Sequence, residues 1–162
     1  MDKLKASPGN LVIIVAGALM LIASFLDFNK YSSSGTTVTV GGQTIHVGGS
    51  ASVSYSAWGS HEFLIATIPV LLGVIMAVHV ALVVFAHNVN LPERVLGFTW
   101  TQIHLVLAGQ ATLMMLAFLI RDTSPLGRGI GMYLMLIAAI ALLVGAILRA
   151  REPQSSAPPP AI

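Results

Sequence analysis

Residues 63–86 read FLIATIPVLLGVIMAVHVALVVFA, and this stretch without Asp, Glu, Lys or Arg decides the fold. A helix needs about 20 apolar residues to cross a hydrocarbon core of about 30 Å, and this run is long enough. Three further apolar runs lie at residues 10–28, 98–120 and 130–148. Over the 162 residues only 9% are charged, and the mean hydropathy is +0.86. The sequence therefore predicts an all-α membrane protein built as a four-transmembrane-helix bundle.

The four runs divide the chain into a membrane domain and two segments of different composition. We expect residues 1–150 to form the transmembrane domain, with a loop at residues 29–62 that is rich in Ser, Thr and Gly. Residues 151–162 form a polar, Pro-rich tail that we expect to be disordered and cytoplasmic. The first run has spanning length, so we interpret it as a retained helix and not as a signal peptide. Pro69 should bend the second helix.

The distribution of Lys and Arg predicts the orientation of the bundle, because short cytoplasmic loops carry an excess of these residues. With the N-terminus inside, the inner residues are Lys3, Lys5, Arg94, Arg149 and Arg151, and the outer residues are Lys30, Arg121 and Arg128. The almost uncharged loop at 29–62 suits export. We therefore expect a multi-pass protein of the plasma membrane with both termini in the cytoplasm and the loop outside the cell.

Composition also excludes several classes of function. There is no cysteine, so disulfides, thiolate metal sites and Cys nucleophiles are excluded. The net charge is only +2 and no basic stripe is present, which argues against nucleic acid as a partner. All six carboxylates lie near the ends of the apolar runs or in loops, and no catalytic motif surrounds them. We expect no enzyme activity, no metal and no cofactor.

The loop at 29–62 carries a strand pattern. Runs rich in Val and Thr at residues 36–40, 43–47 and 51–55 are separated by Gly41-Gly42 and Gly48-Gly49. Such Gly pairs are typical of tight hairpin turns, which need φ > 0. The loop should form a three-stranded antiparallel β-meander, with Val38 opposite Ile45, and Ile45 opposite Val53. The apolar face expected to pack on protein comprises Val38, Val40, Ile45, Val47, Val53 and Tyr55.

Two kinds of surface are candidates for association. An open edge of the meander would accept a further strand from a partner or a second copy, or would simply be solvated. Small residues at i and i+4 bring helices close together, and two such pairs are Ala108 with Thr112 and Ala141 with Gly145. They serve packing within the bundle or contact with another protein. Trp58 is expected to anchor the outer membrane interface, or to take part in association.

His79 and His104 are the polar residues within the helices that most need explanation. Each is six or seven residues from the same end of the bundle, at a depth of roughly 10 Å. Consecutive antiparallel helices would bring the two imidazoles to one level. They could hydrogen-bond to each other or to Gln102 and Thr101, bind haem or a metal, or relay protons. The first interpretation is favoured, because a metal normally needs three or four ligands and no carboxylate lies within a run.

Three short motifs suggest a family resemblance. Phe25-Leu26-Asp27-Phe28, Ser56-Ala57-Trp58 and Leu91-Pro92-Glu93-Arg94 resemble small four-span membrane proteins of actinobacteria, mostly of unknown function. The layout of four helices with a β-rich first outer loop is also similar to that of claudins, which self-assemble through such loops. This chain lacks the paired loop cysteines of claudins, so that likeness concerns architecture alone.

The sequence favours a protein that acts by association in the lipid bilayer. It would be a scaffold, a subunit of a larger membrane complex, or a self-assembling homo-oligomer. Two alternatives remain: a redox or proton-handling subunit that uses His79 and His104, and a small oligomeric channel.

Overall fold

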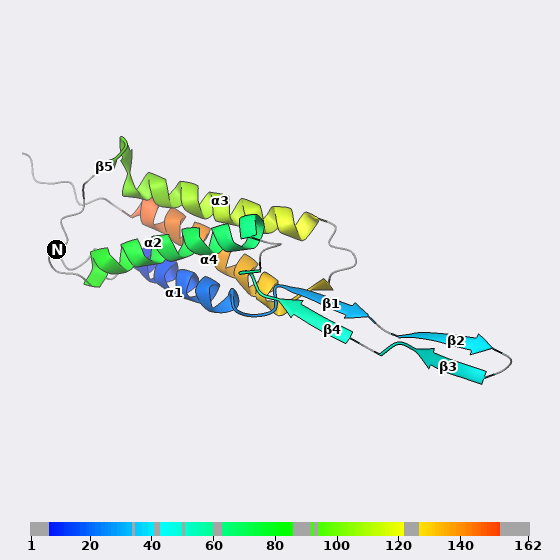
Figure 1. Cartoon of the computed structure of the whole chain (residues 1–162). Coiled ribbons are helices and arrows are strands. Elements are labelled where there is room, and N and C mark those ends of the chain that lie inside the picture. Colours follow the sequence, from blue (N-terminus) through cyan, green and yellow to red (C-terminus); the bar gives the residue numbers. More distant parts are fainter. Residues whose placement is uncertain are drawn as a thin grey trace, which may run out of the picture.

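A computed structural model of the chain describes residues 7–33, 35–40, 43–49, 51–59, 63–85, 92, 94–121 and 127–152. Four helices lie side by side in alternating directions (Figure 1). They are α1 (Pro8–Ala23), α2 (Ile68–Phe85), α3 (Trp100–Ile120) and α4 (Ile130–Arg151). A π-helical turn at Phe63–Thr67 leads into α2, so the winding changes next to Pro69. The tail from residue 153 onward lies outside the described residues.

Three helical segments are long and apolar enough to cross a membrane: Leu64–Phe85, Trp100–Ile120 and Ile130–Arg151. Their positions agree with the predicted runs. The first helix is shorter than the predicted 10–28, because α1 ends at Ala23 after 16 residues. Hydrogen bonds between residues three apart follow the helix: Phe25 N donates to Ile22 O at 3.2 Å, and Leu26 N donates to Ala23 O at 3.1 Å. The apolar residues after Ala23 therefore belong to a turn.

The bundle interior is built from small residues and methionines. Each helix packs on the next one in sequence, and α4 closes the ring on α1. Five of the seven methionines are fully buried, namely Met20, Met76, Met115, Met132 and Met135. Unbranched thioether side chains fill the irregular gaps between closely spaced helices.

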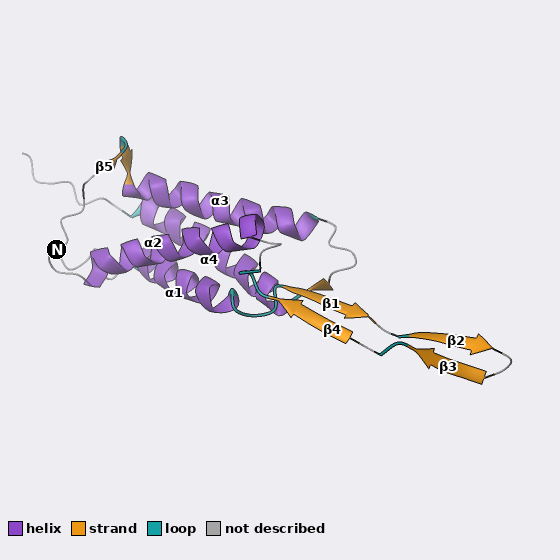
Figure 2. Cartoon of the chain, viewed as in Figure 1, coloured by secondary structure: helices purple, strands orange, loops and turns teal. Residues whose placement is uncertain are grey.

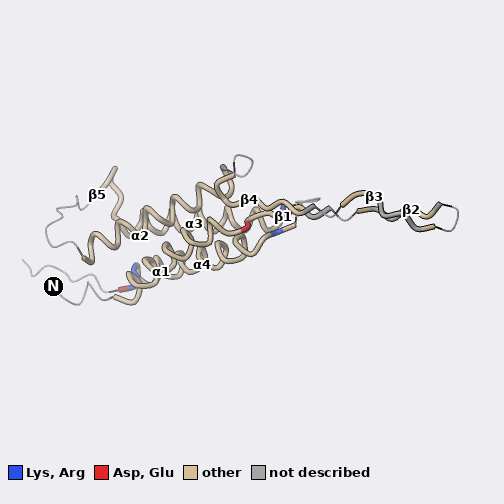
Figure 3. Tube along the Cα trace, turned by 60° about the horizontal axis from the view of Figure 1, so that its bottom comes forward, with Lys and Arg blue, Asp and Glu red and all other residues tan. Residues whose placement is uncertain are grey.

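Large aliphatic side chains cover the exterior of the bundle. Val15 on α1 is 65% exposed, Ile75 on α2 58%, Leu113 on α3 64% and Ile137 on α4 57%. Helices that are apolar on all sides are typical of an apolar environment. Charged residues lie at the two ends of the bundle, and its middle carries none among the described residues (Figure 3). The exterior is that expected of helices surrounded by lipid.

Strands between α1 and α2 form a long arm that extends from one end of the bundle (Figure 2). The arm contains β1 (Asn29–Ser33), β2 (Thr36–Val40), β3 (Gln43–Val47) and β4 (Ala51–Tyr55). At its tip β2 pairs with β3, and at its base β4, β1 and the short β7 (Gly127–Arg128) form a three-stranded antiparallel sheet. At the opposite end of the bundle, β5 (Arg94–Val95) and β6 (Phe98–Thr99) form a small hairpin before α3.

The pairing of the arm confirms one predicted register and corrects the other. Val40 lies opposite Gln43 and Val38 opposite Ile45, as predicted. However, β4 pairs with β1 and not with β3, so that Val53 lies opposite Tyr31. Closer to the bundle than the β2–β3 ladder, the two sides of the arm pair again as β1 and β4, so the described strands show no second reversal. Gly48, with φ +92, lies opposite Gly35 between the β2–β3 ladder and the β1–β4 ladder. The meander is therefore one long hairpin.

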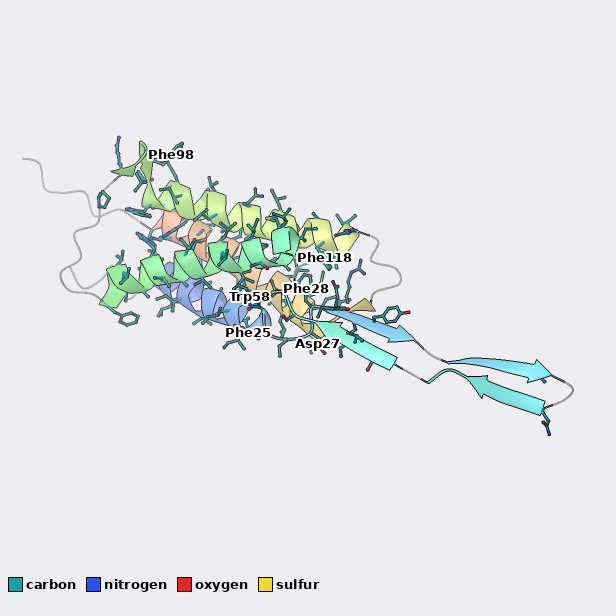
Figure 4. All side chains as sticks on the ribbon, in the orientation of Figure 1. Phe25, Asp27, Phe28, Trp58, Phe98 and Phe118 are labelled. Carbon is teal, nitrogen blue, oxygen red and sulfur yellow. The ribbon has the colours of Figure 1, made fainter. Side chains whose placement is uncertain are left out.

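Backbone contacts clamp the base of the arm to the bundle. Phe28 N donates to Tyr55 O at 2.7 Å, and Gly129 N donates to Phe28 O at 2.8 Å. Gly131 N donates to Asp27 O at 2.9 Å. The Phe28 and Phe118 rings meet with centroids 4.7 Å apart (Figure 4). These contacts join the end of α1, the arm and the start of α4 into one junction.

Side chains of two quoted motifs complete this junction. Trp58 Nε1 donates to Ser24 Oγ at 2.9 Å, and its ring stacks on Phe25 at 5.9 Å. The Asp27 carboxylate accepts hydrogen bonds from Ser54 and from the Lys30 ammonium, and both lower the pKa of Asp27. Phe25-Leu26-Asp27-Phe28 and Ser56-Ala57-Trp58 thus meet in space, and Trp58 has a structural contact in addition to any role at a membrane interface.

Replacement of Gly129 by Ala should destabilise the protein, because a Cβ there would overlap the Asp27 carbonyl oxygen. Forcing a methyl group into such a close contact costs about 1–3 kcal/mol. Thermal unfolding in detergent, followed by circular dichroism, measures the loss. Gly109→Ala on α3 is the matched control, since a Cβ at Gly109 meets nothing within 4 Å. Equal stability of the two variants would contradict the described junction.

Candidate functional site

The arm contains a candidate interaction surface at its strand edges. Its tip is a two-stranded sheet, so β2 and β3 each have an outer edge. At its base β7 covers part of the outer edge of β1, through pairs with Asn29 and Lys30, and β4 is the edge strand. The β3 and β4 side of the arm is therefore the longer unpaired edge. Residues 31–60 contain no Asp, Glu, Lys or Arg, the residues that usually protect such edges.

The predicted apolar face of the arm does not pack on the bundle where it can be followed. Val53 is 45% exposed and Tyr55 43%. The side chains of Val38, Val40, Ile45 and Val47 lie outside the described part of the structure. The expectation of a sheet lying against protein fails for Val53 and Tyr55, because the arm extends away from the helix ends (Figure 1).

The small residues chosen as association candidates lie inside the bundle. Ala108 is fully buried and Thr112 is 7% exposed. Thr112 Oγ1 lies 2.8 Å from Ala108 O and 3.0 Å from Ala139 O, which ties α3 to α4. A Cβ at Gly145 would come within 2.9 Å of Ile13 Cγ1 on α1. Ala141 packs against the core as a partly buried residue. In this chain, their small size serves contacts between its own helices.

His79 and His104 meet inside the bundle, at the end away from the arm. Their ring centroids lie 4.8 Å apart, with the rings at 70° to each other. The Trp100 indole stacks on His79 at 3.8 Å, and its Nε1 donates to Pro92 O at 2.7 Å, which fixes the indole against the chain before β5. We call His79, His104, Trp100 and Arg149 the imidazole cluster. The predicted common level of the two histidines is therefore found.

Arg149 on α4 contributes a cation to this cluster. Its Nη1 lies 3.2 Å from His104 Nδ1. A guanidinium has only donors, so Nδ1 accepts and His104 is neutral with its proton on Nε2. Among the described residues Arg149 forms no salt bridge with a carboxylate, although the charge of Glu152 acts on its guanidinium. Glu152, one turn further on, accepts from Gly9 N at 3.2 Å.

Three imidazole nitrogens of the cluster lack partners within the described protein. They are both ring nitrogens of His79 and Nε2 of His104, and the two residues are only 8% and 1% exposed. The expected partner Gln102 is used elsewhere, because it forms a capping box with Thr99 at the start of α3. A buried polar atom without a partner costs about 1–3 kcal/mol. The cluster is thus more than a satisfied contact between helices.

The geometry does not fit the haem alternative. Two histidines that ligate one haem iron hold the macrocycle between their rings, but these rings touch edge to face. Because His104 Nδ1 accepts from Arg149, the Nε2 of the same ring carries the proton and has no lone pair for an iron ion. Among the described residues, no group of three or more His, Cys, Asp or Glu is placed to hold a metal ion. The donors and the nearby cation suit an anionic or hydrogen-bonding group better than a metal.

Sequence reasoning found the histidines and missed their neighbours. In the sequence, Arg149 bears only on the predicted orientation of the bundle. A helical spacing signal was present, because residues four apart share a helix face, and Trp100 and His104 have that spacing. Comparison with known proteins adds no homologue: no protein-family model and no curated protein matches this sequence.

The contact with Arg149 should fix the tautomer of His104. We expect nitrogen NMR of the labelled protein in detergent to show an unprotonated Nδ1 and a protonated Nε2. Arg149→Leu should release this preference, and a spectrum mixing both tautomers would result. Arg151→Leu is the control, since Arg151 is exposed in the same helical turn. A protonated Nδ1 in the unmodified protein would contradict the described contact.

Proposed function

We propose that this chain is a non-enzymatic integral membrane protein that acts by association, and that its arm pairs with the arm of a second copy. In this proposal the bundle lies in the plasma membrane, the arm lies outside the cell, and both termini lie in the cytoplasm. The observation that carries the proposal is the projecting arm. Among the described strands none pairs with its β3 and β4 edge, and residues 31–60 contain no Lys, Arg, Asp or Glu.

Membrane placement is supported by the form of the bundle. Three of its helical segments have spanning length, and large aliphatic side chains cover the outside of all four helices. Transfer of that surface from water to lipid is favourable by about 25 cal/mol per Å². The excess of Lys and Arg at the end opposite the arm supports a cytoplasmic location for that end.

A second copy is the occupant that best suits the edge. A two-stranded ribbon is marginally stable by itself, and pairing of two ribbons creates a four-stranded sheet. Such a contact is isologous, since the same edge serves both copies. A partner recognised by charge would need complementary charges on the arm, and residues 31–60 contain no Asp, Glu, Lys or Arg. The same lack of charge removes repulsion between copies.

The register identifies the backbone groups that would pair. Val40 and Gln43 lie opposite each other, and two residues separate them along the chain. In a hairpin with a two-residue loop, the pair next to the loop is one that exchanges both hydrogen bonds. Because such pairs alternate with outward-facing ones, Thr37 and His46, which lie opposite each other, direct their N–H groups to opposite edges of the tip. Proline at either position removes an outward donor while it spares the ladder between β2 and β3.

Association through the β3 edge is tested by His46→Pro, with Thr37→Pro as the matched control on the β2 edge. We expect the unmodified protein and Thr37→Pro to be oligomeric by mass measurement in mild detergent or nanodiscs, and His46→Pro to be monomeric. Loss of the oligomer only in Thr37→Pro would move the interface to β2. A monomeric unmodified protein, or no effect of either variant, would overturn association through the arm.

Orientation has a separate test that uses the lack of cysteine. Ser52→Cys on β4 and Leu96→Cys at the β5–β6 turn place single thiols at opposite ends of the bundle, and Leu96 is 93% exposed. An impermeant maleimide should label Ser52→Cys in intact cells and Leu96→Cys only after permeabilisation. The reverse pattern would place the arm in the cytoplasm.

A further inference from the structure

The imidazole cluster has the properties of a binding site whose ligand is supplied from outside the chain. His79 is 8% exposed, yet neither of its ring nitrogens has a hydrogen-bond partner in the described protein. His104 Nε2 is equally unpartnered, and the tautomer fixed by Arg149 makes it a donor. Buried polar groups in folded proteins are normally paired, so this concentration of unpaired nitrogens at one place requires a partner.

The positive charge of Arg149 at the cluster indicates that this partner is negatively charged. Arg149 is partly buried, and its guanidinium faces an imidazole where a carboxylate would be usual. Partly buried cations are usually paired with an anion. Glu152, the residue after α4, lies close enough for its charge to act on Arg149. Its carboxylate nevertheless accepts from Gly9 N and forms no salt bridge with Arg149 among the described residues. Donors from Arg149, His104 and one tautomeric nitrogen of His79 can serve a group that has several acceptor oxygens.

The position of the cluster in the bundle indicates where the ligand comes from. Trp100 is the first residue of α3 and Arg149 lies in the last turn of α4, so the cluster lies near one end of the bundle. Both side chains are partly exposed there, so the cluster borders the surface of the protein at that end. In the proposed membrane placement, helix ends meet lipid headgroups, and basic sites between helices at this depth bind headgroup phosphates.

We propose that the imidazole cluster binds a phosphate group, supplied by an anionic phospholipid headgroup or by free inorganic phosphate. Arg149 and His104 Nε2 donate to its oxygens, and His79 donates from the nitrogen that carries its proton. Stacking of Trp100 on His79 holds that imidazole in place. A phosphate offers more acceptor oxygens than a carboxylate, which matches three donors from three helices.

Native mass spectrometry of the full chain in detergent tests this proposal. The probes are phosphatidylglycerol, phosphatidylcholine and inorganic phosphate, each added to delipidated protein. Arg149→Gln should weaken binding of phosphatidylglycerol about tenfold, which corresponds to the loss of one charge-assisted contact. Arg151→Gln removes an exposed charge from the same turn and should change binding less than about twofold.

His79→Phe is the second variant, because a phenyl ring preserves the stack on Trp100 and removes both nitrogens. Thermal unfolding shows whether each variant is folded. Equal weakening by Arg149→Gln and Arg151→Gln would mean general attraction to a basic surface and would overturn the site. Undiminished binding by folded His79→Phe, or no binding of any probe, would do the same.

Competition identifies the source of the phosphate. If inorganic phosphate displaces phosphatidylglycerol and binds with similar strength, the site takes the free ion. If only phosphatidylglycerol binds, the site takes a lipid headgroup, and weak binding of phosphatidylcholine would show that net negative charge is required. These measurements do not depend on the arm or on orientation in a cell, so their failure is distinct from failure of the proposed association.

Discussion

The close approach of α4 to the end of α1 is the contact on which the arrangement of arm and bundle depends. Gly129 and Gly131 present bare backbone to the carbonyls of Asp27 and its neighbours, and no side chain would fit between them. The hydrogen bonds from these two glycines fix Asp27 and Phe28, from which β1 departs. The direction of the arm is therefore set by the first turn of α4 and not by packing of the arm on the helices.

Apolar length predicted the helices well, but could not predict where α1 ends. Phe25 and Leu26 are as apolar as the helix before them, and only tertiary contacts show that they lie in a turn. Ala57 N donates to Ser24 O at 3.1 Å, so the end of α1 is tied to the segment that follows β4. An interaction between residues so distant in sequence leaves no local pattern in composition.

In the arm, too, one part of the structure depends on neighbouring residues and another part on residues distant in sequence. The Gly-Gly pair in the sequence and the alternation of residues on either side of it were enough to predict the register of β2 and β3. By contrast, β1 reads Asn-Lys-Tyr-Ser-Ser, which lacks the apolar alternation of a strand. It pairs with β4 and β7 because the hairpin and the bundle hold these strands beside it. Counting residues along antiparallel helices was likewise enough to predict that His79 and His104 lie close together. The position of Arg149 beside them could not be predicted in this way, because it depends on the packing of α4 on α3.

Departures from the rules of stable folding are concentrated at the two ends of the molecule. Between them, the bundle interior is well packed with small residues and methionines, and the hydroxyl of Thr112 is paired. Among the described residues, an uncharged strand edge has no neighbouring strand at one end, and at the other the ring nitrogens of a buried histidine have no hydrogen-bond partner. Protection against association would favour charges on the edge, and stability would favour an aliphatic residue in place of His79. Because local rules are usually broken where a protein makes contact with something else, both ends are the places to look for binding. The chemistry differs between them: backbone donors and acceptors on the arm suit another polypeptide strand, and the cation with its imidazoles suits an anion.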